Sequence, residues 1–196
     1  MSSAPRPPAA VLIGPPGAGK TTVGGLLAEL LGVGYTDTDA VVEAVAGKPV
    51  GDIFVEDGEP AFRELERAAV AAALAGDGPE GIVGLGGGAV LDPATQDLLG
   101  GHRVVYLETG FTELAKRVGL DKPRPLLIGI NPRAQLKTLL DQRRPVYAGL
   151  AAITVTTDER EPAEIAAEIA AVLNTTGLKT TGLKTTGLKT AGEPGA

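Results

Sequence analysis

Short apolar runs alternate with helical patterns between residues 9 and 173. The runs predict strands at 10–14, 34–36, 81–85, 103–107 and 153–156. Apolar positions at helical spacing predict helices over 20–31, 38–46, 59–75, 93–99, 111–118, 133–143 and 162–173. Strands that alternate with helices indicate βαβ units. We therefore predict an α/β fold in which helices cover both faces of a parallel sheet.

The two ends of the chain do not share this pattern. Residues 1–8 are rich in Pro and Ser and are predicted to be a flexible N-terminus. From Thr176 the unit Thr-Gly-Leu-Lys-Thr runs three times without a break. One Leu per repeat cannot bury enough surface to offset the entropy of ordering, so 174–196 is predicted to be a disordered tail. A single domain over 9–173 remains.

Composition narrows the class of protein. The 196 residues suit one domain with a core of its own, and the absence of Cys excludes disulfides and thiolate metal sites and favours a cytoplasmic location. No apolar segment approaches the ~20 residues that a membrane-spanning helix needs. The net charge of −6 argues against a protein that binds nucleic acid by neutralising its phosphates.

The most informative motif follows the first predicted strand. Residues 14–21 read Gly-Pro-Pro-Gly-Ala-Gly-Lys-Thr, which matches G-x-x-x-x-G-K-[ST] between a strand and a helix, as in a phosphate-binding P-loop. Its backbone N–H groups and the helix dipole would bind phosphate oxygens. Lys20 would reach the outer phosphates and the Thr21 hydroxyl would bind Mg²⁺. The chain is predicted to bind a nucleoside triphosphate.

Two further strand ends carry candidate chemistry. Asp37 and Asp39 flank Thr38 after the second strand; they could support Mg²⁺, take a hydroxyl proton or bind a polyhydroxylated substrate. Alternatively, they simply cap the next helix. The run Gly86, Gly87 and Gly88 after the third strand could bring backbone N–H groups close to a ligand, or could be an ordinary loop that needs positive φ.

Three arginines are singled out by their surroundings. Arg63 lies at the edge of an apolar helix stripe and could do no more than pair with Glu59 at i,i+4. Arg143 falls in the middle of an apolar helix face, where its charge needs a partner. Arg124 lies between two prolines in a stretch bounded by glycines, which suggests a lid over 119–131 that presents it to the phosphates; a solvated loop charge is the alternative.

Taken together, these residues resemble the shikimate kinase family. The resemblance covers about 10–173 and rests on motifs in the family's order: the P-loop, Asp37-Thr38-Asp39, residues 47–54, Phe62-Arg63, the three glycines, Arg124-Pro125-Leu126-Leu127 and Arg143-x-Pro145-x-Tyr147. It implies a three-layer fold like that of nucleoside monophosphate kinases, with a central five-stranded parallel sheet, a substrate-binding region at about 37–75 and a lid. It also implies transfer of the ATP γ-phosphoryl group to the 3-hydroxyl of shikimate.

The resemblance also assigns the site residues. Catalysis would fall to Lys20, Asp37 and Arg124, and the metal to Thr21 and Asp37. Nucleotide would be bound by Gly17, Ala18, Gly19, Lys20, Thr21, Thr22, Arg117, Arg124 and Arg160. Shikimate would be bound by Asp39, Arg63, Gly86, Gly87, Gly88 and Arg143, with the two arginines on its carboxylate. The resemblance implies ATP and Mg²⁺ as cofactors, and we expect a monomer without nucleic-acid or membrane partners.

Two other functions are compatible with parts of this pattern. A related small-molecule kinase, such as a gluconate kinase, would share the P-loop and the fold. A nucleotide sensor without turnover would share the P-loop alone. Paired arginines with Asp39 favour a ring carboxylic acid with several hydroxyls, and the set Lys20, Thr21, Asp37 and Arg124 favours phosphoryl transfer over sensing.

Overall fold

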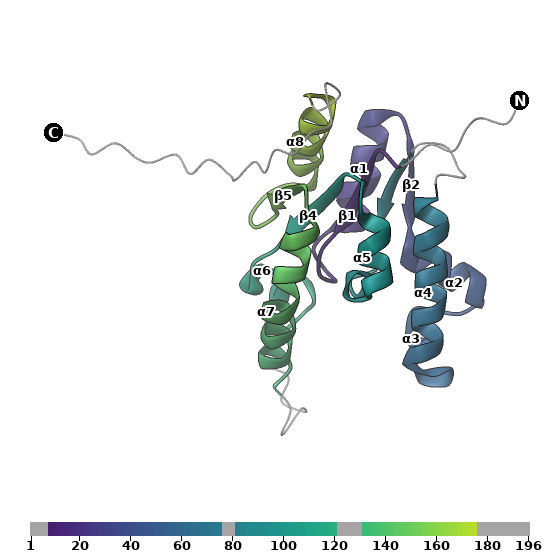
Figure 1. The fold of residues 1–196 in the computed structure, drawn as a ribbon. Coiled ribbons are helices and arrows are strands. Elements are labelled where there is room, and N and C mark those ends of the chain that lie inside the picture. The colour runs from purple at the N-terminus through teal and green to yellow at the C-terminus, as the bar shows by residue number, and fades with distance from the viewer. Residues whose placement is uncertain (1–7, 76–80, 121–130, 176–196) are drawn as a thin grey trace, which may run out of the picture.

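Five parallel strands form a sheet with the spatial order β2-β3-β1-β4-β5 (Figure 1). The computed structural model describes residues 8–75, 81–120 and 131–175. The strands are β1 (Ala10–Ile13), β2 (Gly34–Asp37), β3 (Gly81–Gly84), β4 (Val104–Glu108) and β5 (Ile153–Thr156). β1 is central: Val11 is in register with Val83 on one side and Val104 on the other. The predicted five-stranded parallel sheet is confirmed.

Helices cover both faces of this sheet. The described helices are α1 (Lys20–Leu31), α2 (Thr38–Ala46), α3 (Val50–Glu56), α4 (Gly58–Leu74), the 3₁₀ helix η1 (Ala89–Leu91), α5 (Pro93–Leu99), α6 (Phe111–Arg117), α7 (Pro132–Leu150) and α8 (Pro162–Thr175). On one face, α1 and α8 pack through Leu27 and Ile169 onto strand residues such as Leu12. On the other, α4, α5 and α7 pack onto residues such as Ile13. The layers are helix, sheet, helix.

Helices α2, α3 and α4 enclose a separate small cluster beside the sheet. Val42, Ile53, Phe62 and Ala69 form its buried part, and the rings of Phe54 and Phe62 lie 4.5 Å apart. This cluster lies within the region 37–75 that was expected to bind the acceptor. The cluster gives the region 37–75 hydrophobic packing of its own, next to the end of the edge strand β2.

Two α-helices differ from the sequence prediction by more than two residues. The prediction lacked α3, which spans seven residues and buries only Ile53, so it carries too little periodicity to be recognised. The helix predicted over 133–143 continues to Leu150, past Pro145. Proline removes one backbone donor from a helix interior and lowers its stability. Here the buried side chains of Leu140 and Tyr147, on either side of Pro145, pack in the protein interior and hold the helix together.

Some predicted features lie outside the described residues: 1–7 of the N-terminus, 121–130 of the lid with Arg124, and the chain from Thr176 on. Helix α8 ends at Thr175, two residues beyond its predicted end. Among the described helices, none has both the length and the apolar character needed to cross a bilayer.

Candidate active site

The carboxyl ends of β1, β2 and β3 lie at one edge of the sheet, because all strands run parallel. Ligands of open α/β sheets bind at this edge. A cavity of about 680 Å³ opens there. It is lined by the following predicted residues: Gly17, Ala18, Gly19, Lys20, Thr21, Thr22, Asp37, Asp39, Gly87, Arg117 and Arg160.

The P-loop ends in a left-handed residue that starts α1. Gly19 is the N-cap of α1 with φ 95°, a conformation that side chains disfavour. The first turn of α1 carries no acidic residue, so no charge within the helix opposes the positive end of its dipole at the cavity. The loop therefore has the geometry and charge of an anion site, as predicted.

Lys20 is held against the P-loop itself. Its Nζ donates to the carbonyl oxygens of Gly14 at 2.8 Å and Pro15 at 3.0 Å. Burial lowers the pKa of Lys20 to about 8, and the nearby charges of Asp39 and Asp37 only partly oppose this. An anion in the cavity would favour the charged form of the ammonium.

The Asp37 side chain both caps helix α2 and contacts the P-loop. One carboxylate oxygen accepts from the backbone N–H of Asp39 at 3.1 Å, so Asp37 is the N-cap of α2. The other accepts from the Thr21 hydroxyl at 2.9 Å. The capping alternative is thus correct, and it leaves the second oxygen at the cavity.

Thr21 and Asp37 also meet the requirements for a magnesium ion. A hydroxyl and a carboxylate are the hard oxygen ligands that Mg²⁺ takes, and it usually retains several waters and binds substrate phosphates. No group of three or more His, Cys, Asp or Glu side chains is poised for a metal within the described ranges. Thr21 and Asp37, beside a phosphate loop, therefore fit a metal that reaches the site with its nucleotide.

Tyr35 is a site residue that the sequence analysis missed. Its hydroxyl lies 3.3 Å from the same Asp37 oxygen that Thr21 contacts. Its ring fills the space above two glycines, because a Cβ at Gly24 would clash with the ring and one at Gly84 would clash with the hydroxyl. Burial, with the charge of Asp37, raises the pKa of Tyr35, which therefore stays protonated as a donor.

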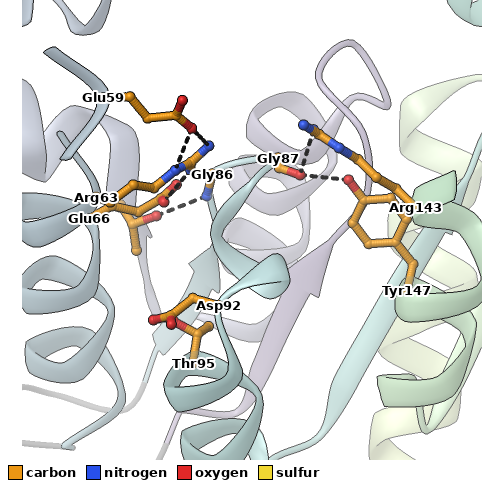
Figure 2. Close-up of polar contacts among 10 residues, drawn as sticks. Glu59, Arg63, Glu66, Gly86, Gly87, Asp92, Thr95, Arg143 and Tyr147 are labelled. Carbon is orange, nitrogen blue, oxygen red and sulfur yellow. Dashed lines mark hydrogen bonds and ion pairs between the residues drawn. The ribbon is translucent and has the colours of Figure 1, made fainter. Parts of the chain in front are cut away.

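Arg63 is held by two carboxylates on its own helix (Figure 2). It meets exposed Glu59 at 3.1 Å, as expected, and also Glu66 at 2.6 Å. Glu66 is 3% exposed, and its burial raises its pKa even with Arg63 beside it. The sequence analysis missed Glu66. This residue lies in the apolar stripe between Phe62 and Val70, and a charge within an apolar helix face is the same signal that singled out Arg143.

The glycine run packs closely against three parts of the site. A Cβ at Gly86 would clash with Asp39, one at Gly87 would lie 2.5 Å from Cδ of Pro16, and one at Gly88 would lie 2.8 Å from Nη1 of Arg63. None of the three glycines has positive φ. Close approach, rather than the positive φ of the alternative, is what crowds these three positions.

Arg143 reaches this loop from the other side. Its Nη1 lies 3.5 Å from the Gly87 carbonyl, and the Tyr147 hydroxyl donates to the same oxygen at 2.6 Å (Figure 2). In the described part of the chain, no carboxylate lies within ion-pair distance of Arg143. The partner that its position demands is therefore not a protein carboxylate among these residues.

Arg117 and Arg160 lie at the far wall of the cavity. Arg117 donates to the Thr157 carbonyl at 2.9 Å and lies 3.4 Å from the Ala18 carbonyl of the P-loop. Arg160 pairs with Glu168 at 2.6 Å. Both line the cavity, but much of each guanidinium is already engaged.

Comparison with known proteins agrees with this arrangement. The family model for shikimate kinase matches residues 16–174. The chain belongs to the shikimate kinase family. It is 61% identical over 170 residues to the shikimate kinase of Thermobifida fusca, which covers 87% of this chain and 97% of the relative. The shikimate kinase of Salinispora arenicola is 58% identical over 166 residues, 85% of this chain and 98% of the relative.

Solved shikimate kinases have the same fold. The Acinetobacter baumannii enzyme, determined in complex with shikimate, aligns with a TM-score of 0.76 at 35% identity, over 89% of this chain and 97% of that one. The nucleoside-monophosphate-kinase-like arrangement of a parallel sheet between helices is confirmed.

Proposed function

We propose that this chain transfers the γ-phosphoryl group of ATP to the 3-hydroxyl of shikimate, giving shikimate 3-phosphate and ADP for aromatic amino-acid biosynthesis. Membership of the shikimate kinase family supports this activity. The observation that carries the proposal is the position of Asp37. Its carboxylate accepts hydrogen bonds from the P-loop threonine and from the backbone N–H of Asp39, so the proposed donor and acceptor regions meet there.

The P-loop side would bind the nucleotide. Backbone N–H groups of Gly17, Ala18, Gly19, Lys20, Thr21 and Thr22 would bind the phosphates, and the Lys20 ammonium would move from its loop carbonyls to the transferring group. Mg²⁺, held by Thr21 with Asp37 supporting its water shell, would neutralise charge on the phosphates. Arg117 and Arg160 would lie beside the adenine, an assignment that rests on the resemblance. Arg124 stays a prediction, since it lies outside the described residues.

The acceptor side would bind a hydroxylated carboxylic acid. Arg143 has no carboxylate partner among the described residues, and Arg63 keeps one N–H free on each terminal nitrogen after its bonds to Glu59 and Glu66. These donors would bind the substrate carboxylate, together with the backbone of Gly86, Gly87 and Gly88. Asp39 would accept hydrogen bonds from ring hydroxyls.

The chemical step needs a deprotonated hydroxyl in line with the γ-phosphorus. The oxygen of the 3-hydroxyl forms the new bond to phosphorus as the bond to the β-phosphate oxygen of ADP breaks. Asp37 would accept the proton of the hydroxyl. Positive charge from Lys20 would stabilise the oxygens of the transferring group.

An assay of ATP consumption with different acceptors tests this function. We expect rapid ADP formation with shikimate and little with quinate, gluconate or no acceptor. Turnover of gluconate in preference to shikimate would support the related-kinase alternative. Tight ATP binding without turnover of any acceptor would support a nucleotide sensor.

Location and assembly are further parts of the proposal. We expect a cytoplasmic protein, because the sequence has no Cys. We expect a monomer, because the described cavity is lined by residues of one chain. Light scattering on the purified protein, at the concentration used in the activity assay, would measure its molar mass and so test whether it is a monomer.

A further inference from the structure

Tyr147 links α7 to the glycine loop through a short hydrogen bond. Its hydroxyl donates to the carbonyl of Gly87 at 2.6 Å, although sixty residues separate them (Figure 2). Tyr147 is fully buried and follows Arg143 by one helical turn, so both side chains lie on the same face of α7. The Arg143 contact to the same oxygen, at 3.5 Å, is too long to fix the carbonyl by itself.

The tyrosine ring is itself held in place. It stacks on Tyr106 of β4, with ring centroids 5.2 Å apart and an interplanar angle of 20°. Burial raises the pKa of Tyr147 to about 12, so its hydroxyl remains a donor at physiological pH. A rigid, protonated donor therefore faces Gly87.

Fixing this carbonyl also fixes the N–H of the next residue. In a planar trans peptide the C=O of Gly87 and the N–H of Gly88 point in opposite directions. Since the carbonyl of Gly87 faces α7, the N–H of Gly88 faces away from α7. Figure 2 shows Arg63 on the opposite side of Gly87 from Tyr147. Among the described residues, none accepts a hydrogen bond from this N–H.

Gly88 and Arg63 are close neighbours. A Cβ at Gly88 would lie 2.8 Å from Nη1 of Arg63, so the peptide and the guanidinium are in near contact. A free backbone N–H beside a cation suits an anionic ligand group.

We propose that Tyr147 is a positioning residue of the acceptor site: by holding the Gly87 carbonyl, it aims the N–H of Gly88 at the carboxylate of the acceptor. This inference rests on the proposed function, because it takes shikimate as that acceptor. The residue acts through the peptide and does not touch substrate.

The test is Tyr147→Phe, with Tyr106→Phe as the matched control. Each change removes one buried hydroxyl from the same stacked pair. The Tyr106 hydroxyl has no hydrogen-bond partner among the described residues, whereas that of Tyr147 holds Gly87. We expect Tyr147→Phe to raise KM and Kd for shikimate about tenfold, with kcat and KM for ATP within about twofold of wild type. All four constants should stay within about twofold in Tyr106→Phe.

Other outcomes separate this role from a merely structural one. A lower melting temperature with an unchanged KM for shikimate would overturn the proposal, as would equal rises in both KM values. Wild-type enzyme that does not phosphorylate shikimate would overturn the proposed function as well, whereas wild-type-like Tyr147→Phe overturns this inference alone.

A second measurement needs no variant and covers the case in which Tyr147→Phe does not fold. In ¹⁵N spectra of the wild-type protein, the amide resonance of Gly88 should shift on addition of shikimate and stay in place on addition of gluconate. An amide that does not respond to shikimate would contradict the proposal.

Discussion

The Asp37 carboxylate lies 2.9 Å from the Thr21 hydroxyl, so the end of β2 contacts the first turn of the P-loop helix. The same carboxylate caps α2 through the N–H of Asp39. One side chain thus fixes the start of the acceptor region relative to the phosphate loop. Two groups proposed to support Mg²⁺ are already adjacent.

Asp37→Asn should distinguish the role of Asp37 as the helix cap of α2 from its role in catalysis. Asn caps helices as well as Asp does, so α2 should persist and the melting temperature should change little. The lost charge should lower kcat at least ~100-fold, in line with loss of one preorganised charged group, and raise the Mg²⁺ concentration needed for half-maximal turnover. Asp141→Asn, which removes the charge of an exposed carboxylate paired with Lys137, is the control. Turnover within a few-fold of wild type would exclude Asp37 from the mechanism.

Binding of ATP should take up protons near pH 8–9 through Lys20. In the empty site its pKa is about 8, below the usual 10.5, so part of the population is neutral in this range. A bound triphosphate raises the pKa, and the neutral fraction then takes up a proton. Below about pH 7 Lys20 is already charged, and uptake through it should vanish. Calorimetric titration in buffers of different ionisation enthalpy measures the uptake.

Variants of Lys20 provide the control for this linkage. Lys20→Arg retains charge at all accessible pH values, so it should bind ATP without the uptake near pH 8–9. Lys20→Met should remain folded with almost no turnover. Equal uptake by wild type and Lys20→Arg would mean that another group titrates.

Two carboxylates that pair with Arg63 should differ greatly in importance. Glu66 is 3% exposed, and it meets Arg63 at 2.6 Å; Glu59 is largely exposed. Glu66→Gln should raise KM for shikimate about tenfold and leave KM for ATP near its wild-type value, since a buried charge-assisted hydrogen bond is lost. Glu59→Gln should change KM for shikimate less than about threefold, because surface ion pairs contribute little. A larger effect from Glu59→Gln would show that Arg63 is positioned mainly by its exposed partner.

Gly84→Ala should be destabilising because of the Tyr35 hydroxyl. A Cβ at Gly84 would meet that oxygen, and overpacking of this kind costs about 1–3 kcal/mol. Tyr35→Phe removes the oxygen, so the penalty of Gly84→Ala should be smaller in that background, with a coupling of about 1 kcal/mol in urea unfolding. Gly24→Ala meets the ring instead, and Tyr35→Phe should not relieve it. Equal penalties for Gly84→Ala in both backgrounds would contradict this packing.

Much of the fold could be read from local patterns. The five strands and the helices α1 and α2 follow the predicted ranges within one residue, because each combines a clear apolar pattern with its own turn or cap. Helix α3 could not be predicted, since seven residues with one buried side chain carry no clear period. The extension of α7 past Pro145 depends on burial of Tyr147, which no local pattern reveals.

The sequence by itself determined the P-loop motif and the parallel α/β fold, because each rests on short-range spacing, and the family resemblance supplied the list of residues proposed to carry the chemistry. Only the tertiary structure decided their partners. It placed Glu66 against Arg63, Tyr35 against Asp37, Pro16 against Gly87, and the hydroxyl of Tyr147 on the Gly87 carbonyl. The pairs Pro16–Gly87 and Tyr147–Gly87 join segments that are far apart in the sequence. The pairs Arg63–Glu66 and Tyr35–Asp37 are close in sequence, and the fold decides which face of α4 and of β2 they lie on. Burial sets the pKa of Lys20 in the same way, since desolvation exists only once the chain has folded around it.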